Sequence, residues 1–189
     1  MNLEDYGSLF HEALSRTGIA VPEGSLLYRA AEEVLEMAAA YASDGRAFLR
    51  SDDPVDALAG FAYGLGWLDA GSRLGLLLPV APTPPDAVSA CIPDAKGAHL
   101  QEKTHRYRGM FRLALTMVET GPDEASPLHR GSEDIHGVAR SWYAEGVGRL
   151  EAGDLTGALA RFSYGYAWLD AGIRAGLLRI TGDRRLFTV

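Results

Sequence analysis

Two acid–base pairs interrupt segments that are otherwise apolar. Asp69 and Arg73 lie four residues apart, and Asp170 and Arg174 repeat that spacing. Residues four apart are neighbours on one face of an α-helix, so each pair predicts an intrahelical ion pair worth a few tenths of a kcal/mol. The alternative is that the polar strip faces a cleft and contacts a ligand.

Aromatic residues accompany both pairs. Tyr63 and Trp67 precede the first pair, and Tyr164 and Trp168 precede the second. Aromatic walls beside a polar strip would suit a small ligand or a peptide, although core packing explains the rings equally well. The candidate ligand-binding set is Tyr63, Trp67, Asp69, Arg73, Tyr164, Trp168, Asp170 and Arg174.

Arg130 and His136 enclose five residues. This spacing resembles the Arg-x(4–6)-His motif of the helical HEPN ribonucleases. The resemblance implies that the pair polarises an RNA phosphate and assists attack by a 2′-hydroxyl. The neighbouring Glu133 and Asp134 disfavour a phosphate at this place.

Other chemistries are not indicated. The histidines and the single cysteine, Cys91, lack the paired spacing of metal ligands, so neither a metal nor a cofactor is expected. A net charge of −7 argues against nucleic-acid binding. One cysteine and the absence of a signal-type segment predict a cytoplasmic protein, and Asp69 within its apolar segment argues against a membrane helix.

The chain contains an internal repeat. Residues 61–77 recur as residues 162–178, an offset of 101, and the same offset extends upstream to Tyr6 and Tyr107 without a gap. Between residues 6 and 77, 28 positions are identical to their partners, which is more than a third of the segment. This identity indicates a tandem duplication.

Each copy is predicted to contain three helices. Asp53 and Asp154 are predicted N-caps of the third helix, and Ser132 is predicted to cap the second helix of the second copy. Alanine and glycine make up most of one arc of the first copy's third helix and predict close approach of another helix. The predicted helices span 3–17, 26–50 and 54–78, then 103–119, a segment from Ser132, and 155–179. The arc consists of Ala57, Gly60, Gly64, Leu68, Gly71 and Gly75.

The repeat predicts an all-α fold of two three-helix bundle units, residues 1–78 and 98–189, joined by a proline-rich linker at 79–97. A three-helix unit alone buries little surface. We therefore expect the two units to pair within the chain through their third helices about a pseudo-twofold axis, with the glycine arc at the seam.

Several of the repeated residues resemble the archaeal domain-of-unknown-function family 357. The resemblance implies an all-helical three-helix unit and an archaeal source. It carries no activity and no catalytic residue. The residues that carry it are Tyr41, Asp44-Gly45, Asp52-Asp53, Tyr63-Gly64 and Leu68-Asp69-Ala70 in the first copy, and Gly153-Asp154, Tyr164-Gly165 and Leu169-Asp170-Ala171 in the second.

These features favour a non-enzymatic protein-interaction or scaffold module that binds a protein partner, because no set of nucleophile, base and oxyanion donor is evident. Two alternatives remain. One is a helical ribonuclease or RNA-binding protein that uses Arg130 and His136. The other is a protein that binds a small ligand between the paired third helices.

Overall fold

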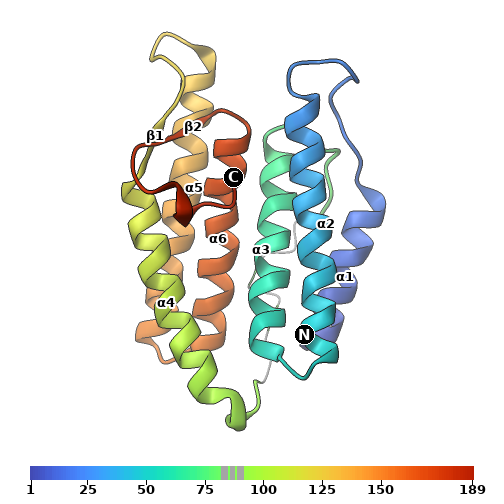
Figure 1. The fold of residues 1–189 in the computed structure, drawn as a ribbon, viewed down its shortest axis with the longest axis vertical. Helices are drawn as coiled ribbons and strands as arrows, with labels where there is room; N and C mark the ends of the chain where they lie inside the picture. The colour runs from blue at the N-terminus through green and yellow to red at the C-terminus, as the bar shows by residue number, and fades with distance from the viewer. Residues whose placement is uncertain (82–84, 86–87, 89–91) are drawn as a thin grey trace.

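The computed structural model describes residues 1–81, 85, 88 and 92–189, and the described helices form two three-helix units side by side (Figure 1). The all-α prediction is confirmed. Cys91 lies outside the described residues. The first unit comprises α1 (Leu3–Arg16), α2 (Tyr28–Arg50) and α3 (Pro54–Arg73). The second comprises the 3₁₀ turn η2 (Asp94–Lys96), α4 (Gly97–Thr116), β1 (Val118–Thr120), α5 (Pro127–Glu151), α6 (Leu155–Arg174), β2 (Leu178–Ile180) and the 3₁₀ turn η3 (Arg184–Leu186).

The third helix of each unit begins as predicted. The side chain of Asp53 accepts a hydrogen bond from the Asp56 amide at 3.0 Å, and Asp154 accepts one from the Gly157 amide at 2.7 Å. Each carboxylate therefore satisfies an otherwise unpaired amide in the first turn and complements the helix dipole.

Both third helices end earlier than predicted. The chain turns at Gly75 and Gly176, whose φ values are +71° and +73°, and then becomes extended. Leu77 pairs with Ile19 in an isolated bridge, and β2 pairs antiparallel with β1 in the equivalent register. Glycine adopts this left-handed conformation without a Cβ penalty, which explains why the helices stop there rather than at 78 and 179.

Two other predicted helices have different boundaries in the structure. The helix predicted at 103–119 begins at Gly97 and ends at Thr116, because Val118 joins β1. Within the predicted linker, residues 94–96 form the 3₁₀ turn η2, and Gly97 begins α4. The helix predicted from Ser132 begins at Pro127, where Ser126 provides the cap.

Ser132 has a different structural role. It is buried within α5, and its hydroxyl donates a hydrogen bond to the Leu177 carbonyl at 2.5 Å. The side chain thereby fastens α5 to the turn before β2. A polar residue near acidic neighbours suggested a cap, but the proline at 127 fits the first helical position better.

Helices α3 and α6 lie side by side at the centre of the molecule (Figure 1). The other helices of each unit lie on the outer side of its third helix (Figure 1). A Cβ at Gly66 would contact the Tyr164 carbonyl oxygen and lie 2.8 Å from the Ala167 Cβ. The two helices therefore approach closely at Gly66, where a side chain would not fit. Apolar residues of both units belong to one hydrophobic core.

The prediction that the glycine arc forms the seam is wrong. A Cβ at Gly64 would lie 2.7 Å from the Phe10 ring, and one at Gly71 would lie 2.6 Å from Val34. The arc therefore packs against α1 and α2 of its own unit, because the short α2–α3 connection makes α2 the nearest neighbour. The seam between units contains Gly66 and Asp69 instead.

Within the described part of the chain, none of the helices combines the length and the apolar character that crossing a membrane requires.

Candidate functional site

The two aspartates at the seam form reciprocal hydrogen bonds between the units. The Tyr164 hydroxyl donates to Asp69 Oδ2 at 2.5 Å, and the Tyr63 hydroxyl donates to Asp170 Oδ2. Each unit supplies one donor and one acceptor, as expected for a pseudo-twofold arrangement. Both carboxylates and both tyrosines are buried, so these bonds fix the register of α3 against α6.

Burial changes the acidity of both carboxyl groups. It raises the pKa of Asp69 from 3.8 to about 6, and the Tyr164 hydrogen bond opposes this increase. It raises the pKa of Asp170 to about 7, against the hydrogen bond from Tyr63 and the effect of nearby Arg174. The neutral forms are favoured because a buried charge loses its hydration.

The basic members of the candidate set lie apart from these hydrogen bonds. Arg174 forms an ion pair with Glu33 of α2, with Nη1 at 2.8 Å from Oε2, so it links the two units. Arg73 is exposed. Neither expected i,i+4 pair is among the ion pairs of the described residues, because Asp69 and Asp170 face the opposite unit.

All four candidate aromatic residues are buried in the core. Trp67 is fully buried, and Tyr164 and Trp168 are nearly so. Tyr63 also lines a cavity. This cavity therefore lies beside the contact between the two third helices rather than within it.

Arg130 and His136 both lie on α5. Because Arg130 and His136 are six positions apart on the helix, their side chains point in directions about 120° apart and their Cα atoms are about 9 Å apart along the axis. Arg130 is exposed, whereas His136 is half-buried, and burial together with Arg140 lowers its pKa. The helix does not bring the two side chains to one point.

A cavity of about 270 Å³ opens where the first unit meets the second; we call it the inter-repeat cavity. It is open on one side and lined mainly by aromatic and apolar groups. Its first-unit lining consists of Tyr41, Asp44, Phe48, Asp56, Ala59, Gly60 and Tyr63. Its second-unit lining consists of Lys103, Tyr107, Met110, Tyr166, Leu186 and Thr188.

The C-terminal segment closes part of this cavity. Leu186 and Thr188 contribute to its wall, and the Tyr166 hydroxyl donates a hydrogen bond to the Leu186 carbonyl. Burial raises the pKa of each tyrosine in the lining, so all four phenols are neutral at physiological pH. The cavity therefore presents uncharged aromatic faces and hydroxyl groups.

A largely buried ion pair contributes to the cavity lining. Lys103 of α4 contacts Asp56 of α3, and its ammonium also lies 5.2 Å from the centre of the Tyr107 ring. Burial lowers the pKa of Lys103, nearby Arg106 lowers it further, and Asp53 opposes both effects. Asp56 thus supplies the charge that makes a buried ammonium tolerable.

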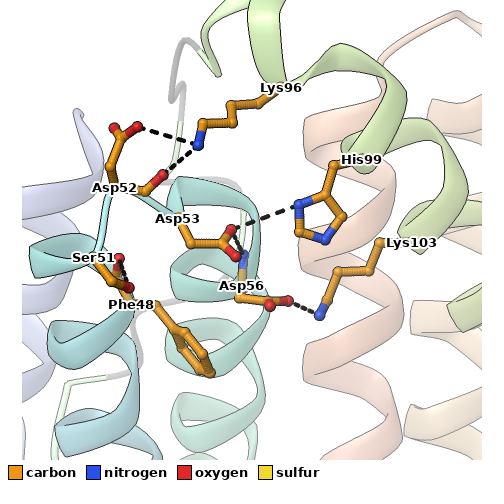
Figure 2. Close-up of polar contacts among 8 residues, drawn as sticks. All are labelled: Phe48, Ser51, Asp52, Asp53, Asp56, Lys96, His99 and Lys103. Carbon is orange, nitrogen blue, oxygen red and sulfur yellow. Dashed lines mark hydrogen bonds and ion pairs between the residues drawn. The ribbon is translucent and has the colours of Figure 1, made fainter.

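Further polar contacts continue from this pair to the surface. Figure 2 shows Asp52 and Asp53 of the α2–α3 turn facing Lys96 and His99. The Lys96 ammonium donates to the Asp52 carbonyl at 2.6 Å, and His99 Nδ1 lies 3.7 Å from Asp53 Oδ1. These contacts fasten the start of α4 to the first unit.

Three potential metal ligands meet in the same place. Oxygen atoms of Asp53 and Asp56 and a ring nitrogen of His99 lie within 4.8 Å of one another. Sequence spacing missed this group because its members come from two distant segments. The Lys103 ammonium already contacts Asp56 and supplies positive charge there.

The corresponding region of the second unit is built differently. At the offset of 101, Gly60 corresponds to Arg161 and Asp44 corresponds to Glu145. The Arg161 side chain is only 4% exposed, its Nη1 donates to the Gly157 carbonyl at 3.1 Å, and its Nε lies 3.6 Å from Glu145 Oε2. A guanidinium thus occupies the second unit at the position where the first unit has only a glycine.

The residues that line the inter-repeat cavity, apart from Tyr63, were not among the candidates. One signal was present in the sequence: Gly60 opposite Arg161 is a change from no side chain to a charged one within the most similar stretch of the repeats. The roles of Tyr107 and Lys103 depend on how α4 lies against α3. That packing cannot be read from periodicity.

Comparison with known proteins agrees with the internal repeat. No curated protein and no solved structure matches the chain. The family model described as "Protein of unknown function (DUF357)" matches residues 5–77 and again residues 106–178. The two matches are offset by 101 residues and together cover more than half of the chain. The chain therefore belongs to the DUF357 family, as a tandem pair of its units.

Proposed function

We propose that this protein binds a small molecule in the inter-repeat cavity. The observation that carries the proposal is a partly open cavity of about 270 Å³ between the units, lined by four tyrosines and Phe48. Pockets for drug-sized ligands measure roughly 300–1,000 Å³, so this one suits a smaller molecule. Aromatic walls supply contact area, and a few fixed polar groups supply orientation.

Polar groups converge on this space from both units. Asp44 is exposed, whereas Asp56 and Lys103 form a largely buried ion pair in the lining. Their positions are fixed by helices rather than by loops, and the hydrogen bond between Tyr166 and the Leu186 carbonyl holds the C-terminal wall. A ligand would therefore meet a largely preformed site, which reduces the entropy lost on binding.

The surface gives less support to the interaction-module hypothesis. The large exposed apolar side chains of the described residues are spread over several elements, including Leu9 on α1, Leu113 on α4 and Leu128 on α5, and the adjacent Leu26 and Leu27 precede α2. Scattered exposed leucines are normal for a protein surface and do not define a docking face.

Filling the cavity tests the proposal. In Gly60→Arg, the new Cβ would meet neighbouring backbone atoms at 3.6 Å or more, and Arg161 shows that an arginine fits at the equivalent position. Gly109→Arg is the matched control, because a Cβ at Gly109 meets nothing within 4 Å. Saturation-transfer NMR with n-pentanol, n-propylguanidine and pentanoate compares a neutral, a cationic and an anionic probe of similar length.

At least one probe should give a saturation-transfer signal with the wild-type protein and with Gly109→Arg, but not with Gly60→Arg. Absence of signal from all three probes at millimolar concentration would contradict small-molecule binding. So would an unchanged signal in Gly60→Arg, provided that its circular dichroism spectrum matches that of the wild type.

A further inference from the structure

Arg161 of the second unit stands at the position equivalent to Gly60, which lines the inter-repeat cavity. Burial lowers the pKa of the Arg161 guanidinium, while Tyr6 opposes this change, so Tyr6 lies close enough to affect the charge. The guanidinium also pairs with Glu145 at the rim. A buried cation is therefore accepted near Tyr6 and next to one carboxylate in this half of the molecule.

The first unit retains the surroundings but lacks the cation. Tyr6, Trp142 and Tyr164 of the Arg161 region correspond at the offset of 101 to the cavity residues Tyr107, Tyr41 and Tyr63. Glu145 corresponds to Asp44, and Arg161 corresponds to Gly60. Three aromatic positions and one acidic position are thus conserved between the units, and only the guanidinium-bearing side chain is missing.

The charges of the cavity lining agree with this comparison. Asp44 and Asp56 are acidic and Lys103 is the single basic residue among the lining residues described. Lys103 contacts Asp56, whereas no cation among the described residues lies within ion-pair distance of Asp44. The lining therefore retains one uncompensated negative charge, and the faces of its tyrosines add negative potential.

We propose that the inter-repeat cavity binds a small molecule that carries a guanidinium group, with the cation directed toward Asp44 and stacked among Tyr41, Tyr63 and Tyr107. This inference rests on the proposed function and specifies its ligand class. The ligand takes the place that Arg161 occupies in the second unit. A planar guanidinium both stacks on aromatic rings and pairs with a carboxylate, which a plain hydrophobic ligand cannot do.

Titration calorimetry with n-propylguanidine tests the inference, because this compound reproduces an arginine side chain from Cβ outward. We expect n-propylguanidine to bind at least tenfold more tightly than pentanoate or n-pentanol, with one site per chain. Asp44→Asn should weaken binding about three- to tenfold, as expected for loss of a charge-assisted contact at a rim. Asp134→Asn, an exposed acid on α5, makes the same chemical change away from the cavity and should have no effect.

The second unit offers a complementary variant. Arg161→Gly should open the equivalent space and raise the stoichiometry from one site to two. If this variant does not fold, the Asp44→Asn and Gly60→Arg results still decide the inference. Tighter binding of pentanoate, or equal binding to wild type and Asp44→Asn, would overturn the guanidinium assignment while leaving small-molecule binding intact. Failure of every probe would overturn both.

Discussion

The buried carboxyl of Asp170 should make the stability of this protein depend on pH in an unusual direction. Burial raises its pKa from 3.8 to about 7, so the folded protein holds a proton that the unfolded chain releases at much lower pH. Stability contributed by the neutral carboxyl is complete below about pH 3.8 and is lost as the pH rises through about 7.

The size of the effect follows from the same values. One pKa unit corresponds to 1.36 kcal/mol, so the change from 3.8 to about 7 corresponds to about 4 kcal/mol. Most of this, about 3 kcal/mol, should be lost between pH 5 and pH 8, because the folded group titrates near 7. That is a large share of the 5–15 kcal/mol that typically stabilises a domain.

Asp170→Asn removes the titration but keeps a carbonyl oxygen that can accept the Tyr63 hydrogen bond. Urea unfolding followed by circular dichroism at pH 5 and pH 8 gives the free energy of unfolding for each protein. Between these pH values, wild type should lose about 3 kcal/mol relative to the variant. Asp134→Asn, whose side chain is exposed in folded and unfolded chains alike, should follow the wild type. A constant difference between wild type and Asp170→Asn would refute the reasoning.

Three further changes test the packing of the two units. Gly66→Ala should reduce the free energy of unfolding by about 1–3 kcal/mol, because its Cβ would contact the Tyr164 carbonyl. Gly109→Ala, in open space on α4, should instead stabilise the protein by up to about 1 kcal/mol. Equal effects of the two changes in urea unfolding would contradict the close approach of α3 and α6. Tyr164→Phe removes a hydrogen bond that stabilises the ionised carboxylate of Asp69, so it should raise the pKa of Asp69 above about 6. Carboxyl ¹³C NMR titration measures this pKa, and an unchanged value would exclude the contact. Ser132→Ala should lower the free energy of unfolding by about 1 kcal/mol, because it removes the hydrogen bond to the Leu177 carbonyl. The first unit has Ala31 at the equivalent position. Thermal unfolding with no change in stability would show that the bond contributes nothing.

The sequence predicted the architecture well because the duplication exposed it. Matching Asp53 and Asp154 located the caps of α3 and α6, and helical spacing identified most helices. Periodicity could not show which face of α3 meets which neighbour, so the glycine arc was assigned to the wrong interface. The face of α3 that meets α6 carries Asp69, whose burial in the core is explained by the hydrogen bond from Tyr164.

The candidate site was only partly predictable. Tyr63 was identified because it repeats as Tyr164, but the repeat also drew attention to residues that serve packing in both units. The cavity depends on a position where the units differ, Gly60 against Arg161, and on where α4 lies. The sequence shows that difference, but periodicity does not show that Gly60 lines a cavity or that the Arg161 side chain is buried.

The covalent joining of two units permits an asymmetry that two separate identical chains could not have. In a homodimer of one unit, each side of the twofold axis must carry the same residue, so a glycine that opens one cavity opens both and an arginine that fills one fills both. The fused chain can keep the reciprocal Tyr63–Asp170 and Tyr164–Asp69 bonds, which need symmetry, while its flanks evolve independently. Because the two units are fused, the residues that hold them together and the residues at Gly60 and Arg161 can change independently.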